Sequence, residues 1–180
     1  MPKENKSRYA ILGLLSFMPC SGYDIKKMTD NSLKFFWSEN YGHIYPLLKE
    51  LEEEGLADSK KVDSGKGPSK NVFSLTAKGK KVFESWLKSA ESRQRYRIEI
   101  LLKMFFSSHL SVKEIVAKLE AHICEQEELL EEYKKVEAEF AEIPQKRYRL
   151  SAVITLDYGK RHAQMVIQWA RECIKTVNSL

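Results

Sequence analysis

Seven lysines lie between residues 60 and 81, a segment of 22 residues that contains one aspartate and has a net charge of +6. The remainder of the chain is nearly balanced, because the whole sequence of 180 residues has a net charge of +5. Clustered lysines neutralise phosphates and release the counterions that surround a nucleic acid. A basic, solvated loop can also serve solubility alone. The charge therefore indicates a nucleic-acid surface only if the neighbouring elements have the right form.

The basic segment has the pattern of a β-hairpin. Residues 56–62 and 70–75 are strand-like runs, and residues 64–69 between them contain two glycines and a proline. These are turn residues, so we expect lysines near this turn to extend away from the body of the domain. Thr76 is expected to cap a following helix, whose buried face contains Val82, Phe83, Trp86 and Leu87.

Two short helical patterns begin the chain. Apolar residues recur at helical spacing from residue 9 to residue 15, and Pro19 follows this first pattern. Ser21 is a favourable helix N-cap, so we expect a second helix to begin there and to end near residues 31–32.

A third helical pattern precedes the hairpin and ends at Gly55, which suits a left-handed helix stop. Because proline lacks a backbone N–H, Pro46 requires this helix either to start near His43 or to bend. The apolar positions of the pattern are Ile44, Leu47, Leu48 and Leu51. Three helices followed by a hairpin are the order of a winged helix-turn-helix, which places one helix in a DNA groove.

Five spaced motifs follow this order of elements: AILGLL at 10–15, SGYDI at 21–25, IYPLL at 44–48, LEEEGL at 51–56 and LTAKG at 75–79. Together they resemble the PadR family of bacterial transcriptional regulators. The resemblance is strongest over residues 8–87 and continues more weakly to residues 156–162, which are similar to the last helix of longer members. Phe73 stands where many members carry tyrosine. The resemblance implies an operator-binding winged helix, a helical dimerisation domain and a repressor.

The third helix and the hairpin contain the candidate DNA-binding residues. Recognition helices read bases with their first turns, so the candidates for base or near-base contact are Asn40, Tyr41, His43, Tyr45 and Lys49. The residues expected to hold phosphates lie in the hairpin and at the start of the second helix; they are Lys66, Ser69, Lys70, Ser21 and Tyr23. Packing of Tyr23 and Tyr45 into the helix-turn-helix core is an alternative that the sequence leaves open.

The C-terminal half predicts three further helices. Residues 98–106 form an almost wholly apolar pattern, which is typical of a core or interface helix. Ser111 and Glu114 have the spacing of a capping box, and they open a long helix through about Ala141. Pro144 ends that helix, and the last one is expected from about residue 147 to residue 177.

The last helix has a broad apolar face that Asp, Arg and Gln residues interrupt. Such a face is awkward on the surface of a single chain and favours pairing between subunits, whereas a helical hairpin folded only on itself is the alternative. The residues expected at a dimer interface or an effector site are Leu150, Ile154, Tyr158, Met165, Trp169 and Cys173. The PadR resemblance implies that a cavity here can receive a small aromatic effector beside Trp169, although core packing is the simpler interpretation.

Several classes of function are not supported. The sequence has no apolar run of the length that spans a membrane and no signal-peptide pattern, so we expect a cytoplasmic protein without a membrane partner. Three widely spaced cysteines suggest neither a disulfide framework nor a zinc motif, and His122 and Cys124 point to different faces of a helix. No phosphate loop or nucleophile elbow appears. We therefore expect no catalytic residue, metal or cofactor.

The sequence thus predicts a mainly α fold with a small β-hairpin and two domains. Residues 1–90 are expected to form a winged helix-turn-helix DNA-binding domain, and residues 91–180 a helical dimerisation and effector domain. We interpret the chain as a homodimeric transcriptional regulator, a repressor that binds a palindromic operator on double-stranded DNA and that a small aromatic effector can release. The alternative is a winged-helix adapter that binds proteins without sequence-specific DNA contact.

Overall fold

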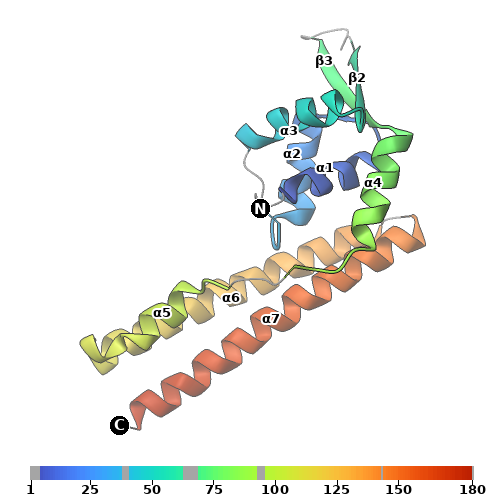
Figure 1. Ribbon diagram of the computed structural model, residues 1–180. Helices are drawn as coiled ribbons and strands as arrows, with labels where there is room; N and C mark the ends of the chain where they lie inside the picture. Colours follow the sequence, from blue (N-terminus) through green and yellow to red (C-terminus); the bar gives the residue numbers. More distant parts are fainter. Residues whose placement is uncertain (1–4, 38–40, 63–68, 93–95, 143, 180) are drawn as a thin grey trace. The chain divides into compact units, whose positions relative to one another are not determined.

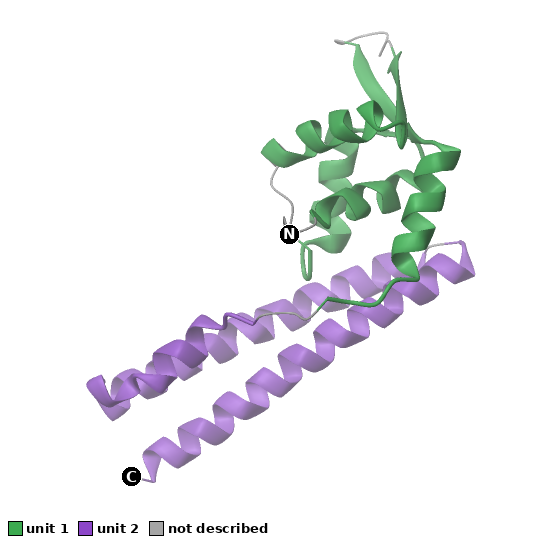
Figure 2. Ribbon diagram, viewed as in Figure 1, with its two compact units in different colours: residues 1–92 green, residues 93–180 purple. Residues whose placement is uncertain are grey.

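The computed structural model describes residues 5–37, 41–62, 69–92, 96–142 and 144–179. The chain divides after Ser92 into two compact units, which Figure 2 distinguishes by colour. The first unit contains helices and a small sheet, and the described residues of the second are helices and their connections. The predicted fold class, mainly α with a small β-hairpin, is confirmed.

The core of the first unit forms where the apolar faces of its helices converge. The helices are α1 (Ser7–Leu15), α2 (Gly22–Met28), α3 (Tyr41–Glu53) and α4 (Ala77–Leu87), labelled in Figure 1. The largest side chains that are fully buried in this unit are Ile11, Leu12, Ile25, Ile44, Leu48 and Leu51. Because α3 supplies three of these six, its inner face is fixed to the core and its outer face is left for contacts with other molecules.

A single π-helical turn, Thr29–Leu33, follows α2. The hydroxyl of Thr29 donates to the carbonyl of Ile25 at 2.9 Å, and that of Ser32 donates to the carbonyl of Met28 at 2.6 Å. Hydroxyls that bond back to the preceding turn widen or bend a helix. The helix was predicted to end near residues 31–32. In the structure α2 itself ends at Met28, and the π-helical turn continues to Leu33.

The sheet has three antiparallel strands rather than the two of the predicted hairpin. These are β1 (Cys20–Ser21), β2 (Ala57–Val62) and β3 (Lys70–Leu75), in the order β1-β3-β2. We call β2, β3 and the residues between them the wing; the two strands extend away from the helices toward the end of β2 and the start of β3 (Figure 1). The additional strand, β1, pairs Ser21 with Val72 and so joins the start of α2 to the wing.

The end of α3 and the start of α4 form one tightly packed joint. Gly55 has a φ of +69°, which confirms it as the left-handed stop of α3. The hydroxyl of Thr76 donates to the carbonyl of Gly55 at 2.8 Å, and the ammonium of Lys78 donates to that of Glu54 at 2.6 Å. At Gly79, a Cβ would lie 2.0 Å from the carbonyl oxygen of Leu56, so only glycine allows α4 to pack this closely.

The start of α3 differs from the expectation. The helix begins at Tyr41 and continues through Pro46, whereas Pro46 predicted a start near His43 or a bend. Pro46 is the sixth residue of α3 and lies beyond its first turn, so the helix lacks the one backbone hydrogen bond that an N–H at this position would donate.

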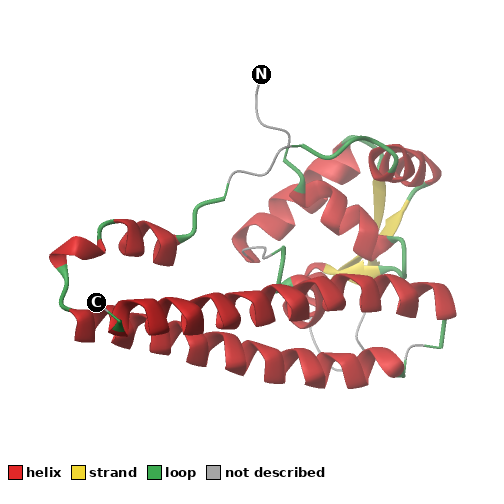
Figure 3. Cartoon of the chain, turned by 90° about the horizontal axis from the view of Figure 1, so that it is seen from below, coloured by secondary structure: helices red, strands yellow, loops and turns green. Residues whose placement is uncertain are grey.

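The second unit is built around two long antiparallel helices, α6 (Val112–Ala141) and α7 (Lys146–Asn178), which lie side by side in Figures 1 and 3. Ser111 and Glu114 form the predicted capping box at the start of α6. Ion pairs join α6 to α7 at Lys160–Glu137 (2.9 Å) and Arg171–Glu127 (2.7 Å). The side chains buried on these two helices are Leu119, Tyr133, Leu156, Ala163, Ile167 and Ala170.

Gly159 sets the distance between α6 and α7 near the middle of the pair. A Cβ at this position would lie 2.5 Å from the hydroxyl oxygen of Tyr133, whose ring is buried there. Burial also raises the pKa of the Tyr133 hydroxyl above its ordinary value. The two helices can therefore approach closely here, because the large side chain of Tyr133 packs against a glycine, which has no side chain.

A short helix, α5 (Glu99–Phe105), precedes α6, with a 3₁₀ turn at Ser107–His109 between them. None of the residues of α5 is buried within the single chain, and Phe105 is 81% exposed. The prediction that this segment is a core helix is therefore wrong for one chain, whereas an interface role stays a prediction.

Candidate nucleic-acid interface

The outer face of α3 is the centre of the candidate interface. Because an α-helix turns about 100° per residue, Lys49 lies near the middle of the face opposite the buried leucines, and His43 and Tyr45 lie on its two flanks. All three side chains are exposed. This outer face of α3 combines a cation, an imidazole and a phenol, which are hydrogen-bonding groups suited to base edges and phosphates.

Tyr45 also contacts the helix that precedes α3. A Cβ on Gly22 would lie 2.8 Å from the Tyr45 ring, so the ring rests against the first turn of α2 and leaves 41% of the residue exposed. Tyr23, on that same turn, is 65% exposed and does not belong to the core. The alternative of core packing thus applies in part to Tyr45 and not to Tyr23.

Ser21 and Asp24 form a complete capping box at the start of α2. The Ser21 hydroxyl donates to the Asp24 carboxylate at 2.6 Å, and the Ser21 backbone N–H donates to the same oxygen at 2.9 Å. In return, the Ser21 oxygen accepts from the Asp24 N–H at 3.2 Å. These bonds, with a smaller contribution from Lys70, hold the pKa of the Asp24 carboxyl below its ordinary value. Ser21 is buried, so its hydroxyl serves α2 rather than an outside phosphate.

The outward face of the wing carries two lysines. Residues two apart on a strand share a face, and so do cross-strand partners. Val72 pairs with Lys60 and lies two residues from Lys70, so both lysines lie on the outer face. The ammonium of Lys70 is 3.6 Å from the Asp24 carboxylate. Lys60 has no ion pair with any residue that the structure describes.

The C-terminal end of α3 is acidic, and most of its carboxylates are engaged within the fold. Arg8 donates to Glu54 at 2.5 Å and lies 3.8 Å from Glu50, and the hydroxyl of Ser59 donates to Glu52 at 2.5 Å. Negative charge at this end repels a phosphate backbone, whereas the cations lie at the wing and on the outer face of α3. This asymmetry directs a polyanion toward the N-terminal part of α3 and the wing.

The predicted DNA-binding residues fall into three groups. His43, Tyr45, Lys49, Tyr23 and Lys70 are exposed, whereas Ser69 is half-buried and Ser21 is buried. Asn40 and Lys66 lie outside the described residues, and Tyr41 is described only as the first residue of α3.

Lys60 and Asp24 were not singled out from the sequence as residues of this surface. Lys78 and Lys80 were also counted there among the cations of the basic segment. Lys60 could have been found from the alternation of the hairpin, but the pairing of Asp24 with Lys70 depends on β1, which no local pattern revealed. Lys78 caps α3, and Lys80 lies 4.0 Å from Glu84 within α4. Part of the basic segment therefore serves the fold.

The residues predicted at a dimer interface or effector site divide between two environments. Four of them are exposed on α7: Leu150, Ile154, Tyr158 and Met165. Trp169 and Cys173 are half-buried. The exposed set forms an apolar stripe at helical spacing along α7, and a stripe of this kind marks an interaction surface.

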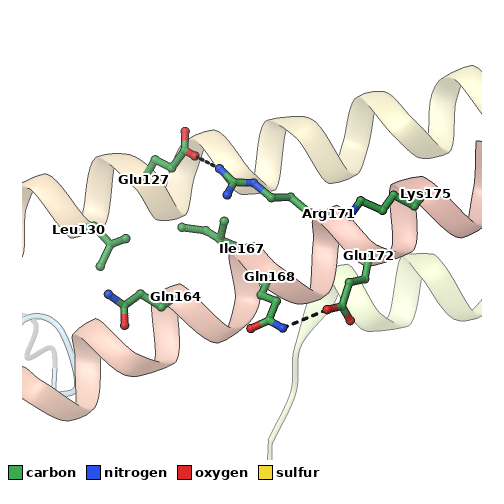
Figure 4. Close-up of a pocket in the computed structure, with 8 residues that line it drawn as sticks. All are labelled: Glu127, Leu130, Gln164, Ile167, Gln168, Arg171, Glu172 and Lys175. Carbon is green, nitrogen blue, oxygen red and sulfur yellow. Dashed lines mark hydrogen bonds and ion pairs between the residues drawn. The ribbon is translucent and has the colours of Figure 1, made fainter.

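A shallow groove of about 420 Å³ lies between α6 and α7 and is shown in Figure 4. Leu130 and Ile167 give it apolar surface, while Arg171 is paired with Glu127 and Gln168 donates to Glu172 at 3.0 Å. Lys175 also lines the groove and has no ion pair with a described residue. Trp169 and Cys173 are not among the lining residues.

The thiols and histidines do not assemble into a site within the described part of the chain. No group of three or more potential metal ligands occurs among the residues that the structure describes. Burial raises the pKa of the Cys20 thiol to about 11, so this thiol stays protonated at neutral pH and is a poor nucleophile. None of the helices described is long and apolar enough to cross a membrane.

Comparison with known proteins accounts for both units. Residues 11–85 match the model of the transcriptional regulator PadR-like family, and residues 96–178 match that of the virulence activator alpha C-terminal domain. The negative transcriptional regulator PadR of Bacillus subtilis (strain 168) is 37% identical over 108 residues. Residues 11–85 thus carry the domain of the PadR-like family. That alignment spans 59% of this chain and 59% of the Bacillus protein.

Two solved structures of Bacillus subtilis PadR resemble this chain over nearly its full length. The complex with operator DNA is 25% identical, covers 96% of this chain and 99% of its own, and has a TM-score of 0.87. The complex with p-coumaric acid is also 25% identical, covers 97% and 99%, and has a TM-score of 0.83. The wing and α3 thus occur here in a fold that is known with DNA bound.

Ser21→Ala tests the cap that fixes the start of α2 in the PadR-like domain. It should lower the free energy of unfolding by about 1 kcal/mol in urea titrations, because the Asp24 N–H and carboxylate lose their shared partner. Asp24 has a lowered pKa when folded, so its share of the stability is present above the unfolded pKa of about 4 and is lost as pH falls through the folded value. The deficit should therefore shrink in acid.

Two controls separate this cap from a general effect of removing a hydroxyl. Ser111→Ala removes the matching cap of α6 and should cost about as much, whereas Ser85→Ala, at an exposed site within α4, should change stability by less than about 0.5 kcal/mol. If Ser21→Ala behaves like Ser85→Ala, the capping box does not stabilise α2.

Proposed function

We propose that this chain is a homodimeric transcriptional repressor that binds operator DNA through α3 and the wing. The observation that carries the proposal is the outer face of α3, on which His43, Tyr45 and Lys49 are exposed. The same unit also contains the outward lysines of the wing. Further support comes from the Bacillus relative, a negative regulator whose similar fold has been solved with operator DNA.

In this proposal the first turns of α3 enter the major groove. His43, Tyr45 and Lys49, together with Asn40 and Tyr41, contact bases or the sugars and phosphates beside them. Tyr23 and the wing residues Lys60, Lys66, Ser69 and Lys70 lie along the backbone. Ser21 has a positioning role, since its hydroxyl is buried in the cap of α2. Binding to chromosomal DNA assigns the protein to the cytoplasm of a bacterial cell.

The alternative of a protein-interaction adapter has less support. An adapter needs no cations on the face that meets its partner, whereas Lys49 and Lys60 are exposed on the two elements that contact DNA in winged helices. An exposed apolar patch would be the signature of an adapter surface, and among the α3 residues whose exposure the structure describes, Tyr45 is the single large hydrophobic residue that is exposed.

A homodimer follows from the second unit in the same proposal. The apolar stripe on α7 and the exposed side chains of α5 are too hydrophobic for a surface in water, and a second copy of the chain is the partner that buries both sets. A two-fold dimer presents two copies of α3 to two half-sites, so we propose that the operator is palindromic.

We further propose that a small aromatic acid releases the protein from its operator. The Bacillus relative has been solved with p-coumaric acid, which combines an aromatic ring with a carboxylate. In this chain Trp169 is a half-buried aromatic side chain on α7. Its ring has the chemistry that the aromatic part of such an acid requires, namely a stacking surface.

His43→Ala tests sequence readout by α3. On an operator selected from random DNA, the variant should lose on the order of 1–3 kcal/mol of binding free energy per base contact, while binding to random DNA should stay nearly unchanged. Glu53→Gln, at the acidic end of α3, is the control and should not weaken either complex. Equal weakening of both complexes by His43→Ala would point to a phosphate contact or misfolding. The adapter would be favoured if no sequence can be selected.

Ile154→Glu tests the dimer. Light scattering at micromolar concentration should give the wild type about twice the chain mass of 20.9 kDa and the variant the mass of one chain, because a charge would be buried at the interface. Thr155→Glu adds the same charge at the neighbouring exposed position of α7 and should remain dimeric. A monomeric wild type, or identical masses for the two variants, contradicts this interface.

Titration of the operator complex with p-coumaric acid tests the effector. The aromatic acid should release the DNA, whereas cyclohexanecarboxylic acid, which has the charge but no aromatic ring, should not. Trp169→Phe should raise the concentration needed for release, since the smaller ring stacks less surface. Release by both acids alike, or by neither, would contradict an aromatic effector.

A further inference from the structure

The carboxylate of Asp24 accepts two hydrogen bonds and forms one ion pair on the surface that the proposed function assigns to DNA. The hydrogen-bond donors are the Ser21 hydroxyl at 2.6 Å and the Ser21 backbone N–H at 2.9 Å, and the Lys70 ammonium nitrogen lies 3.6 Å from the carboxylate. A hydroxyl, a backbone N–H and an ammonium are also the donors that proteins use for DNA phosphates. An internal anion is therefore paired with the Lys70 ammonium, which would otherwise be available to the backbone of DNA.

The register of the sheet explains why Asp24 reaches Lys70. The strand β1 pairs Ser21 with Val72, and this pairing places the first turn of α2 beside the wing strand that begins at Lys70. Lys60 lies opposite Val72 on the other side of β3, on the same outer face. Among the described residues Lys60 has no ion pair, so the two lysines differ in that Lys70 alone is ion-paired with a carboxylate there.

The ion pair contributes little to the stability of the fold. The side chains of Lys70 and Asp24 are 51% and 39% exposed, and pairs this open to water contribute between nothing and about 1 kcal/mol. The capping role of Asp24 needs only its contacts with Ser21. The contact with Lys70 is therefore weak enough for DNA to compete with it.

We propose that Asp24 is a specificity-determining residue, which keeps Lys70 from binding the phosphates of random DNA and yields it only on the operator. This inference rests on the proposed function. Binding to random DNA depends almost wholly on phosphate neutralisation, so a lysine that stays with its carboxylate adds nothing to it. On the operator, base contacts from α3 fix the register, and the fixed phosphate can take Lys70 from Asp24.

The experiment compares Asp24→Asn, Lys70→Ala and Lys60→Ala by fluorescence anisotropy with operator and random duplexes from about 50 to 200 mM salt. Asparagine retains a cap acceptor but has no charge. In Asp24→Asn, Lys70 becomes free, so random DNA should bind more tightly and the slope of log K against log salt should steepen by about 0.9. Over that salt range the added loss of affinity is about threefold to fourfold. The preference for operator over random DNA should fall.

Lys70→Ala and Lys60→Ala provide the matched comparison in the natural background. Lys60→Ala should weaken random and operator DNA alike, whereas Lys70→Ala should weaken the operator complex and leave random DNA nearly unchanged. The gain of Asp24→Asn on random DNA should vanish in the double variant with Lys70→Ala and persist in the one with Lys60→Ala.

Two results would overturn the inference: equal losses on random DNA for the two lysine variants, or a gain from Asp24→Asn that survives Lys70→Ala. Should Asp24→Asn fail to fold by circular dichroism, the two lysine variants decide the question alone. Failure of the proposed function looks different, since no selected duplex would then bind more tightly than random DNA. The comparison of Lys70 with Lys60 on random DNA would still test the pair.

Discussion

The pairing of Ser21 with Val72 is the contact on which the DNA-facing surface depends. Through its backbone, Ser21 belongs to β1 and fixes the wing; through its hydroxyl, it caps α2. A buried residue that does both sets the position of the helix-turn-helix relative to the wing. The ring of Tyr45 rests against the neighbouring Gly22, and this contact positions α3 relative to the first turn of α2. The arrangement of α2, α3 and the wing thus follows from two adjacent residues.

Charge on this surface is organised more finely than the total suggests. Of the seven lysines in the basic segment, Lys78 caps α3 and Lys80 lies within reach of Glu84, while Lys70 is paired with Asp24. The acidic end of α3 is held mainly by Arg8. A count of charges along the chain therefore overstates the cations available to a polyanion, because electrostatic function depends on which partners the fold has already supplied.

Local chemistry in the sequence predicted the elements whose causes are local. Ser21, Ser111 and Thr76 were identified as caps and Gly55 as a helix stop, since each acts within a few residues of its own position. The strand β1 was missed because two residues are too short for a periodic pattern, and its partner lies some fifty residues away. The ion pair of Asp24 with Lys70 depends on that strand. The outer face of α3 could be predicted from the helical pattern. The ion pairing beside it could not, because it depends on the register between β1 and β3.

Gly79 makes the joint between the end of α3 and the start of α4 rigid. Its Cα lies against the carbonyl of Leu56, and the hydrogen bonds of Thr76 and Lys78 close the same joint, so α4 cannot slide along its axis without moving the end of α3. The joint therefore fixes how the end of α3 lies against α4 at the point where the wing begins. In the proposed dimer, two such units would be presented together, and the spacing between them would have to match the spacing between the two half-sites of the operator.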